Sequence, residues 1–194
     1  PGGTMTVSAM LWINNTGPPF DDVRVRRAVA MAIDREPIVK TLYKGRATTG
    51  PVLPPAAQYA MALADFPAEV RPFLEYNPTR AKQLLAEAGY TKGPDTLINV
   101  TAAWAAPASM VAEAVAGMLN AVGIRATLNW IEYAKMLATV HRAEYPVGEM
   151  ALTPRTASTP EDAHALTSFW SGGGAGNRSI VRDPEYDRLF ERFL

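Results

Sequence analysis

Apolar residues recur along the chain with two different spacings, one typical of strands and one typical of helices. Near the start every second residue is apolar, which indicates a half-buried strand. These residues are Met5, Val7, Ala9, Leu11 and Ile13. A stripe spaced i, i+3, i+4, i+7 and i+8 follows and predicts an amphipathic helix. It consists of Val25, Ala28, Val29, Ala32 and Ile33.

Capping residues mark where the first helices begin. Pro18-Pro19 disfavours helix before Phe20, and Asp21 or Asp22 suits the N-cap position. Asp34 is expected to cap a second short helix that ends near Gly45. Residues 46–76 lack periodicity and are interrupted by prolines, so an ordered loop with a short helix is expected there.

The middle of the chain predicts a strand–helix–strand unit. After a helix from Asn77-Pro78 to Gly89, apolar residues alternate at Ile98, Val100, Ala102 and Trp104. A helix from Pro107 to Gly123 comes next, and a second strand carries Ile124, Ala126, Leu128 and Trp130. The unit at 97–131 therefore has the βαβ pattern, which predicts two parallel strands with a right-handed crossover.

Three helices and a strand are predicted in the last third. The first helix would bury Tyr133, Met136, Leu137 and Val140, and a strand would run over 147–153. A capping box at Thr159 and Asp162 predicts a helix that includes Ala163, Leu166 and Trp170. The last helix starts at Asp183-Pro184, and its inward residues would be Tyr186, Leu189, Phe190 and Phe193.

Composition narrows the function classes. The 194 residues are 48% hydrophobic and 20% charged, which is ordinary for a globular domain. Nineteen basic residues balance nineteen acidic ones, so nucleic acid is not an expected partner. Cysteine is absent, and no apolar run is long enough to cross a bilayer. No signal-peptide pattern starts at Pro1, so a cytoplasmic protein or a trimmed piece of an exported one is expected.

Four segments carry a resemblance to a known family. They are PPFDDVRVRRAVAMAIDRE at 18–36, YNPTRAKQLLAEAGYTKG at 76–93, AVAGMLNAVGIRATLNWIEYAKML at 114–137 and GNRSIVRDPEYDRLF at 176–190. Each resembles a stretch of the family 5 solute-binding proteins, which deliver peptides, nickel complexes, opines and similar solutes to ABC importers. The segments follow the family's order and approximate spacing over nearly the whole chain.

The resemblance implies a fold, a role and a location. The fold would be an α/β lobe of the periplasmic-binding-protein type (type II, large cluster), with a mixed sheet flanked by helices. Residues 1–194 would form one domain, the second lobe of a two-lobe receptor whose first lobe is missing here. It would capture a peptide or peptide-like solute by hinge closure and deliver it to ABC permease subunits in the periplasm or outside the cell. The alternatives are an opine, sugar or other acidic solute, or a catalytic or protein-interaction domain on the same scaffold.

Candidate ligand contacts follow from where the strands end. Ligands in open α/β sheets bind beyond the carboxyl ends of the strands, where loops and helix N-termini meet. The expected contacts are Trp104, Ser109, Tyr133, Arg155, Thr156 and Ser158. For Trp104 and Tyr133 the competing interpretation is core packing, and for Arg155 it is an ordinary solvated or ion-paired arginine.

One departure from the family pattern bears on the solute. Peptide-binding relatives have a tryptophan and an aspartate here, and the aspartate captures the amino terminus of the peptide. Counted back from Pro160, these positions hold Thr153 and Thr156, and no acid occurs between Glu149 and Glu161. A buried ammonium needs a charged partner, whereas the guanidinium of Arg155 suits a carboxylate or phosphate.

The sequence nominates no catalytic or metal-binding set. His141 and His164 are the only histidines, and neither stands in an H-E-x-x-H spacing. No serine lies in a G-x-S-x-G elbow, and the glycine run at 172–176 lacks the Lys-Ser/Thr of a phosphate loop. We therefore expect neither an enzyme nor a cofactor or metal site.

Overall fold

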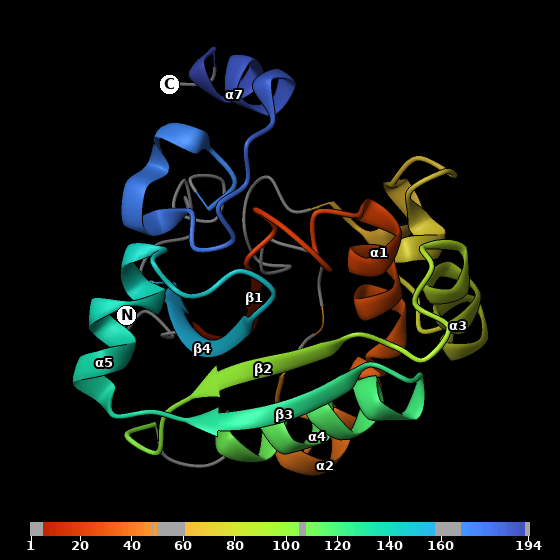
Figure 1. Cartoon of the computed structure of the whole chain (residues 1–194), viewed down its shortest axis with the longest axis horizontal. Coiled ribbons are helices and arrows are strands. Elements are labelled where there is room, and N and C mark those ends of the chain that lie inside the picture. The colour runs from red at the N-terminus through yellow and green to blue at the C-terminus, as the bar shows by residue number, and fades with distance from the viewer. Residues whose placement is uncertain (1–5, 48, 50–60, 105–107, 158–167, 193–194) are drawn as a thin grey trace.

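A four-stranded mixed sheet with the order β1-β4-β2-β3 runs through the molecule (Figure 1). The computed structural model describes residues 6–47, 49, 61–104, 108–157 and 168–192. The strands are β1 (Thr6–Ile13), β2 (Asp95–Val100), β3 (Arg125–Trp130) and β4 (Met150–Ala157). β2 is parallel to both β3 and β4, and β1 is antiparallel to β4. The predicted parallel βαβ unit is thereby confirmed.

Helices surround this sheet. They are α1 (Val23–Ala32), α2 (Arg35–Leu42), α3 (Pro78–Glu87), α4 (Ala108–Ala121), α5 (Tyr133–Ala138) and α7 (Pro184–Glu191). Four short 3-10 turns are η1 (Leu63–Asp65), η2 (Arg71–Phe73), η3 (Val140–Arg142) and η4 (Ser171–Gly176). Side chains cap the starts of α1, α2, α3 and α7, and these caps are Asp22, Asp34, Asn77 and Asp183. None of the described helices is long and apolar enough to cross a membrane.

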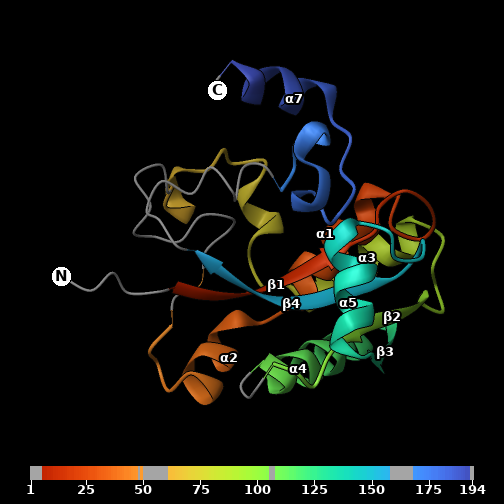
Figure 2. The ribbon, with the colours of Figure 1, turned by 90° about the vertical axis from the view of Figure 1, so that its left-hand side faces the viewer.

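The larger core lies between one face of the sheet and α1, α3 and α4. Ile98, Val100, Met150 and Leu152 point into it from β2 and β4. α1 packs beside α3, and α2 packs beside α4 along the same layer (Figures 1 and 2). The buried stripe predicted for α1 is confirmed, since all five of its residues belong to this core.

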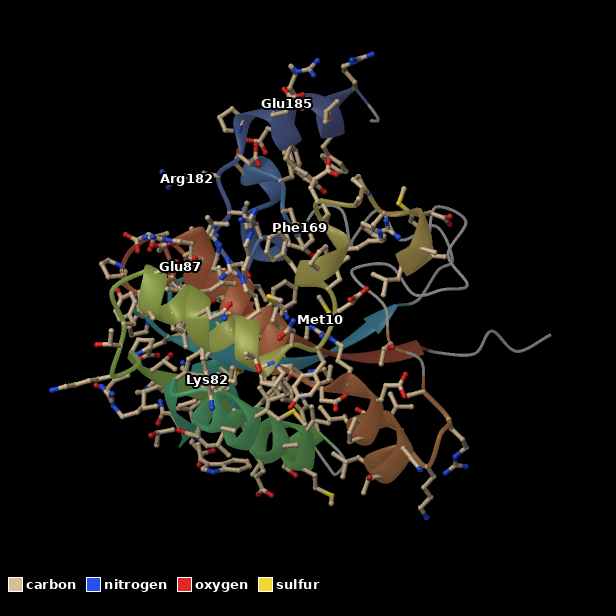
Figure 3. All side chains as sticks on the ribbon, turned by 90° about the vertical axis from the view of Figure 1, so that its right-hand side faces the viewer. Met10, Lys82, Glu87, Phe169, Arg182 and Glu185 are labelled. Carbon is tan, nitrogen blue, oxygen red and sulfur yellow. The ribbon has the colours of Figure 1, made fainter. Side chains whose placement is uncertain are left out.

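The opposite face of the sheet carries a smaller cluster. Met136, Val140, Tyr145 and Ala151 are its buried members, with Trp104 and Ile131 packed against them. α5 lies beyond the carboxyl ends of β2 and β3, at the left of Figure 1. α7 lies at the far end of the molecule, and Glu185 projects outward from it (Figure 3).

The C-terminal end of the first strand is covered on both faces, so the expectation of a half-buried strand is wrong there, whereas Ala9 is exposed. Trp12 and Asn14, on the supposedly exposed side, are only 3% and 2% exposed. Arg178 lies over the Trp12 ring, and the Asn14 side chain donates to the Tyr145 carbonyl. The edge of the strand is bonded to Ser179, because Asn15 N–H donates to the Ser179 carbonyl and Ile13 N–H donates to the Ser179 hydroxyl. Periodicity within one strand cannot reveal a second layer that comes from a segment so distant in the chain.

Two strand boundaries also differ from expectation. β2 ends at Val100, so Ala102 and Trp104 lie in the following turn and not in the strand. β4 runs over Met150–Ala157, later than the predicted 147–153, because Val147 and Gly148 form a turn. Gly148 has a φ of 79°, which is unsuited to an extended strand.

The sequence analysis predicted too many buried positions in the helices near the surface. Tyr133, Leu137 and Leu189 are 43%, 39% and 50% exposed, although an inward position was predicted for each. α5 ends at Ala138, and the chain then tightens into η3, so the predicted helix is cut short. The described part of the proline-rich loop, 61–76, contains 3-10 turns and no α-helix. Trp170 lies outside any helix, while residues 158–167 and Phe193 fall outside the described residues.

Candidate functional site

Two of the candidate ligand contacts meet at the carboxyl ends of β2 and β3. Trp104 lies in the turn after β2, and Tyr133 is the first residue of α5. Their rings are in edge-to-face contact, with centroids 6.1 Å apart and an interplanar angle of 79°. Ile131 N–H donates to the Val100 carbonyl over 2.8 Å, which holds the two strand ends together. The pair thus presents an aromatic surface at the expected end of the sheet.

His141 extends this aromatic surface inward. It belongs to η3, and its imidazole lies 6.3 Å from the Trp104 ring with a tilt of 31°. One terminal nitrogen of Arg178 lies 3.2 Å from His141 Nδ1. An arginine can only donate, so Nδ1 is assigned as the acceptor and the proton of the neutral ring is placed on Nε2.

Arg178 is positioned by its two neighbours in sequence. The Asn177 side chain donates to the carbonyls of Trp170 and Val181 and accepts from Val181 N–H, which closes a local turn. Ser179 is bonded to the end of β1, as described above. These contacts fix the backbone on both sides of Arg178, whose side chain reaches Thr153 and His141.

Thr153 and Trp12 complete the cluster around Arg178. The Thr153 hydroxyl accepts from Trp12 Nε1 over 2.8 Å and from Arg178 over 3.3 Å. The guanidinium lies 5.3 Å from the Trp12 ring centroid, within the range of a cation–π contact. The structure therefore links β1, β4, η3 and the turn at Asn177 through one chain of polar and aromatic contacts.

The electrostatics of the cluster favour a neutral histidine. Burial lowers the pKa of His141 below its usual value, and the nearby charge of Arg178 lowers it further. His141 Nε2 is buried and has no hydrogen-bond partner among the described residues. The hydroxyl of Tyr145 is also buried without a hydrogen-bond partner among the described residues, and burial raises the pKa of Tyr145.

The other sequence candidates are not brought together in the same way. Ser109 lies in the first turn of α4 and is half-buried. Arg155 and Thr156 belong to β4, where their backbones pair with Ser8 and Val7 of β1. The side chains of Arg155 and Thr156, and the whole of Ser158, are outside the described part of the structure. Their roles as ligand contacts stay predictions.

Sequence reasoning missed Trp12 and Arg178. Trp12 stood on the side of β1 that was expected to be polar, and Arg178 was noted only as part of the segment 176–190. No local pattern connects residues 12, 141, 153 and 178, so only the fold could bring them together. His141 itself is half-buried.

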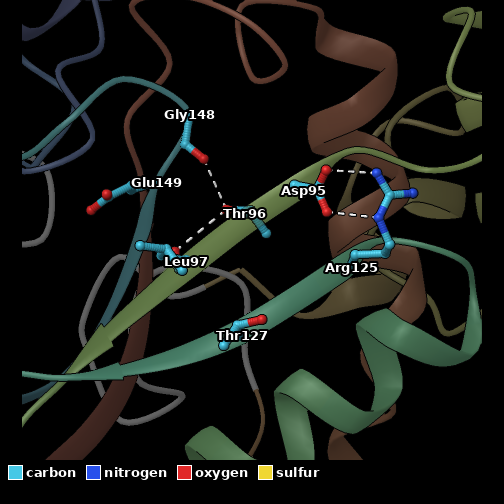
Figure 4. Close-up of a pocket in the computed structure, with 7 residues that line it drawn as sticks. All are labelled: Asp95, Thr96, Leu97, Arg125, Thr127, Gly148 and Glu149. Carbon is cyan, nitrogen blue, oxygen red and sulfur yellow. Dashed lines mark hydrogen bonds and ion pairs between the residues drawn. The ribbon is translucent and has the colours of Figure 1, made fainter.

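A shallow hollow of about 350 Å³ lies elsewhere, at the amino ends of β2 and β3 (Figure 4). Asp95 and Arg125 form an exposed ion pair of 2.6 Å on its rim, and Thr96 donates to the Gly148 carbonyl beside it. It is at the opposite end of the strands from Trp104 and Tyr133. Among the described residues, no group of three His, Asp or Glu side chains could hold a metal ion.

Comparison with known proteins gives a consistent result. The family model described as bacterial extracellular solute-binding proteins, family 5, middle, matches residues 2–177. The di/tripeptide-binding protein 2 of Pseudomonas aeruginosa is 33% identical over 69% of this chain and 24% of its own length. Heme-binding protein A of Haemophilus influenzae is 32% identical over 96% of this chain and 33% of its own length.

Solved structures share the fold. A dipeptide-binding protein from Pseudoalteromonas in complex with Met-Leu superposes with a TM-score of 0.75 and 26% identity. The match covers 96% of this chain and 38% of the other. HbpA2 from Haemophilus parasuis gives a TM-score of 0.76 at 25% identity, over 97% and 38%. The chain thus spans a quarter to two fifths of the length of these proteins.

Proposed function

Because this chain belongs to the bacterial extracellular solute-binding proteins of family 5, we propose that it is a lobe of an ABC-importer receptor that captures a peptide or peptide-like solute. The observation that carries the proposal is the pairing of Trp104 with Tyr133 at the carboxyl ends of β2 and β3. An open aromatic surface offers a solute a large apolar contact at the edge of the sheet where ligands of α/β folds bind.

The chain would be the second lobe of a longer receptor. This is supported by matches that cover nearly all of this chain but less than two fifths of each relative. The first lobe would close over the aromatic surface by a hinge motion and bury the solute between the lobes. The closed form would then dock on the permease subunits in the periplasm or outside the cell. No covalent step is part of this mechanism, and no cofactor is assigned to it.

A peptide is favoured as the solute because two of the similar proteins are named for binding dipeptides or tripeptides. The threonine at position 156 argues against a free α-ammonium as the main anchor, since it carries no negative charge. Peptides with a blocked amino terminus, or solutes with an acidic end, would therefore be tolerated.

The decisive experiment is native mass spectrometry of the receptor expressed from its complete gene, followed by release and identification of the bound solute. We expect a peptide or a peptide-like amide. Retention of an opine or a sugar would replace the peptide assignment but keep the importer role. Turnover of the retained solute by the purified protein would contradict the receptor role itself.

Binding by the isolated chain is a second test. One lobe provides only half of the contacts, so isothermal calorimetry of the 194-residue chain with the identified solute should show weak binding. Submicromolar affinity in the isolated chain would show that the second lobe is sufficient and that closure is not needed.

A further inference from the structure

We propose that the outer edge of β3 pairs with the same edge of a second copy of this chain, so that two receptors form a weak two-fold dimer through one continuous sheet. This interaction surface goes beyond solute binding and requires no solute. β3 is the last strand of the sheet on the side away from β1, so among the described residues only one of its edges is paired (Figure 1). A strand edge of this kind offers backbone donors and acceptors to another strand.

The backbone groups of β3 alternate between β2 and the outer edge. Arg125 N–H donates to the Pro94 carbonyl, and Ile131 N–H donates to the Val100 carbonyl, so the odd-numbered residues face β2. The even-numbered residues therefore point their N–H and carbonyl groups away from β2. These are Ala126, Leu128 and Trp130.

Asn120 closes one end of this outer edge. Its side-chain amide donates to the Ala126 carbonyl over 3.0 Å, and its side-chain oxygen accepts from Ala126 N–H over 3.2 Å. Asn120 thus takes the place that a neighbouring strand would occupy. The outward backbone groups of Leu128 and Trp130 have no partner among the described residues, so these two residues remain available for pairing.

The available groups fit one antiparallel register. In an antiparallel pair, hydrogen bonds join residues that lie directly opposite each other at every second position. Leu128 opposite Trp130 of the second copy, with the reverse pair related by symmetry, satisfies both available residues in each copy. The two Asn129 residues then lie opposite each other on the two-fold axis.

Neighbouring registers are disfavoured by groups that are already bonded. With the axis at Leu128, Trp130 would lie opposite Ala126, whose N–H and carbonyl are taken by Asn120. With the axis at Trp130, Leu128 would lie opposite Glu132. The Glu132 carbonyl already accepts from Met136 N–H at the start of α5. The axis at Asn129 therefore leaves the fewest backbone groups unpaired.

Side chains are compatible with the same register. The ring of Trp130 is 48% exposed, and in the dimer it would pack on Leu128 of the second copy as a cross-strand pair. Asn129 donates to the Asn99 side chain over 2.8 Å. Its remaining amide donor and acceptor would meet those of the other Asn129 across the axis.

Charge favours the antiparallel orientation, and the small contact limits its strength. Arg125 begins β3, and Glu132 follows the end of the strand. Antiparallel pairing brings the Arg125 end of one copy toward the Glu132 end of the other, so opposite charges approach. Arg125 also pairs with Asp95, and Glu132 is exposed. A contact through so short a strand falls below the area of standard interfaces, which indicates a transient dimer.

The first test is sedimentation equilibrium of the receptor expressed from its complete gene. We expect a monomer–dimer equilibrium with a Kd on the order of 100 µM. Trp130→Lys removes the ring and places a charge on the edge, so it should weaken the dimer about tenfold or more. Leu97→Lys is the matched control, because Leu97 is 36% exposed but lies on β2, which is paired on both edges. It should leave the Kd unchanged.

The second test traps the register with a disulfide. The 194 residues contain no cysteine, so a single cysteine can be placed at the axis. In Asn129→Cys the two thiols would face each other at a distance that a disulfide can span, and oxidation should give a crosslinked dimer on a non-reducing gel. Thr127→Cys lies on the same face, but its two copies would be roughly 13 Å apart and should not crosslink. Circular dichroism checks that each variant is folded.

Each outcome bears on the dimer without involving the solute. A wild type that stays monomeric at roughly ten times the expected Kd overturns the proposal, as would happen if another part of the longer receptor covered β3. A dimer that Trp130→Lys leaves intact also overturns it, and so does equal crosslinking of the two cysteine variants. None of these results affects the receptor function, which is tested by solute identification.

Discussion

The indole of Trp12 donates a hydrogen bond of 2.8 Å to the hydroxyl of Thr153, and the two residues are 3% and 0% exposed. They lie on neighbouring antiparallel strands, where Trp12 is paired with Ala151 and Met10 with Thr153. The bond therefore runs diagonally across the sheet face. The same hydroxyl accepts from Arg178, so one side chain ties β1 and β4 to the segment after the glycine run.

Replacing this acceptor should destabilise the fold. Thr153→Val has nearly the same shape but leaves the Trp12 donor buried without its partner. We expect a loss of about 1–3 kcal/mol in the free energy of unfolding, measured by urea denaturation. Thr127→Val, at an exposed position of β3, is the matched control and should change little. Equal effects of the two substitutions would show that the buried bond contributes nothing.

His141 should make stability depend on pH. Burial and the charge of Arg178 hold the folded-state pKa of His141 below 6.5, so below that pH the unfolded chain binds more protons than the folded one. Stability from this group is complete above pH 6.5 and falls as the pH drops through the window between the two pKa values. The difference between wild type and His141→Gln, measured by chemical denaturation from pH 7.5 to 5, isolates this contribution. A constant difference across that range would contradict the prediction.

The start of α1 tests which of two aspartates caps the helix. Asp22 accepts from Arg24 N–H over 2.8 Å and pairs with its guanidinium, and these contacts lower the pKa of Asp22. Asp22→Ala should cost about 0.5–2 kcal/mol of stability, whereas Asp21→Ala should be nearly neutral. Thermal unfolding of both variants under one condition decides the matter, and a larger loss for Asp21→Ala would reverse the assignment.

The choice between Asp21 and Asp22 also illustrates what could be predicted from the sequence. The rules for capping residues and apolar stripes depend on neighbours within one or two turns, so they located α1, α3 and the βαβ unit. They could not choose between Asp21 and Asp22, because both satisfy the same local rule. They also could not foresee that Trp12 would be buried, since its cover comes from residues near 179.

The candidate site likewise contains residues that local rules could nominate and residues that depend on distant contacts. Trp104 and Tyr133 were nominated because Trp104 ends one predicted strand and Tyr133 follows the next, and the parallel topology brings these two strand ends together. Arg178 was missed because its place depends on a turn made by Asn177 and on contacts with β1. An arginine that packs inside the protein, as Arg178 does against Trp12 and Thr153, cannot be told from a surface arginine by local sequence.

Two glycines with left-handed backbone should respond differently to alanine. Gly89 and Gly93 have φ values of 88° and 71°. A Cβ at Gly93 would lie 1.6 Å from the Gly123 carbonyl oxygen, whereas one at Gly89 would meet nothing within 4 Å. Gly89→Ala should cost about 1–2 kcal/mol from backbone strain alone. Gly93→Ala should cost clearly more, or prevent folding, in the same urea denaturation assay. Similar costs would mean that the two loops relax freely.

The last prediction concerns Tyr133, whose exposed ring is expected to contact the solute. Tyr133 and Leu137 lie one turn apart on α5 and are 43% and 39% exposed, so truncating either should change stability little. Tyr133→Ala should weaken binding of the identified solute about tenfold, because a buried aromatic contact of this kind is worth about 1–2 kcal/mol. Leu137→Ala is the matched control and should bind as the wild type does. Calorimetry on the receptor expressed from its complete gene measures both, and equal affinities in the two variants would remove Tyr133 from the site.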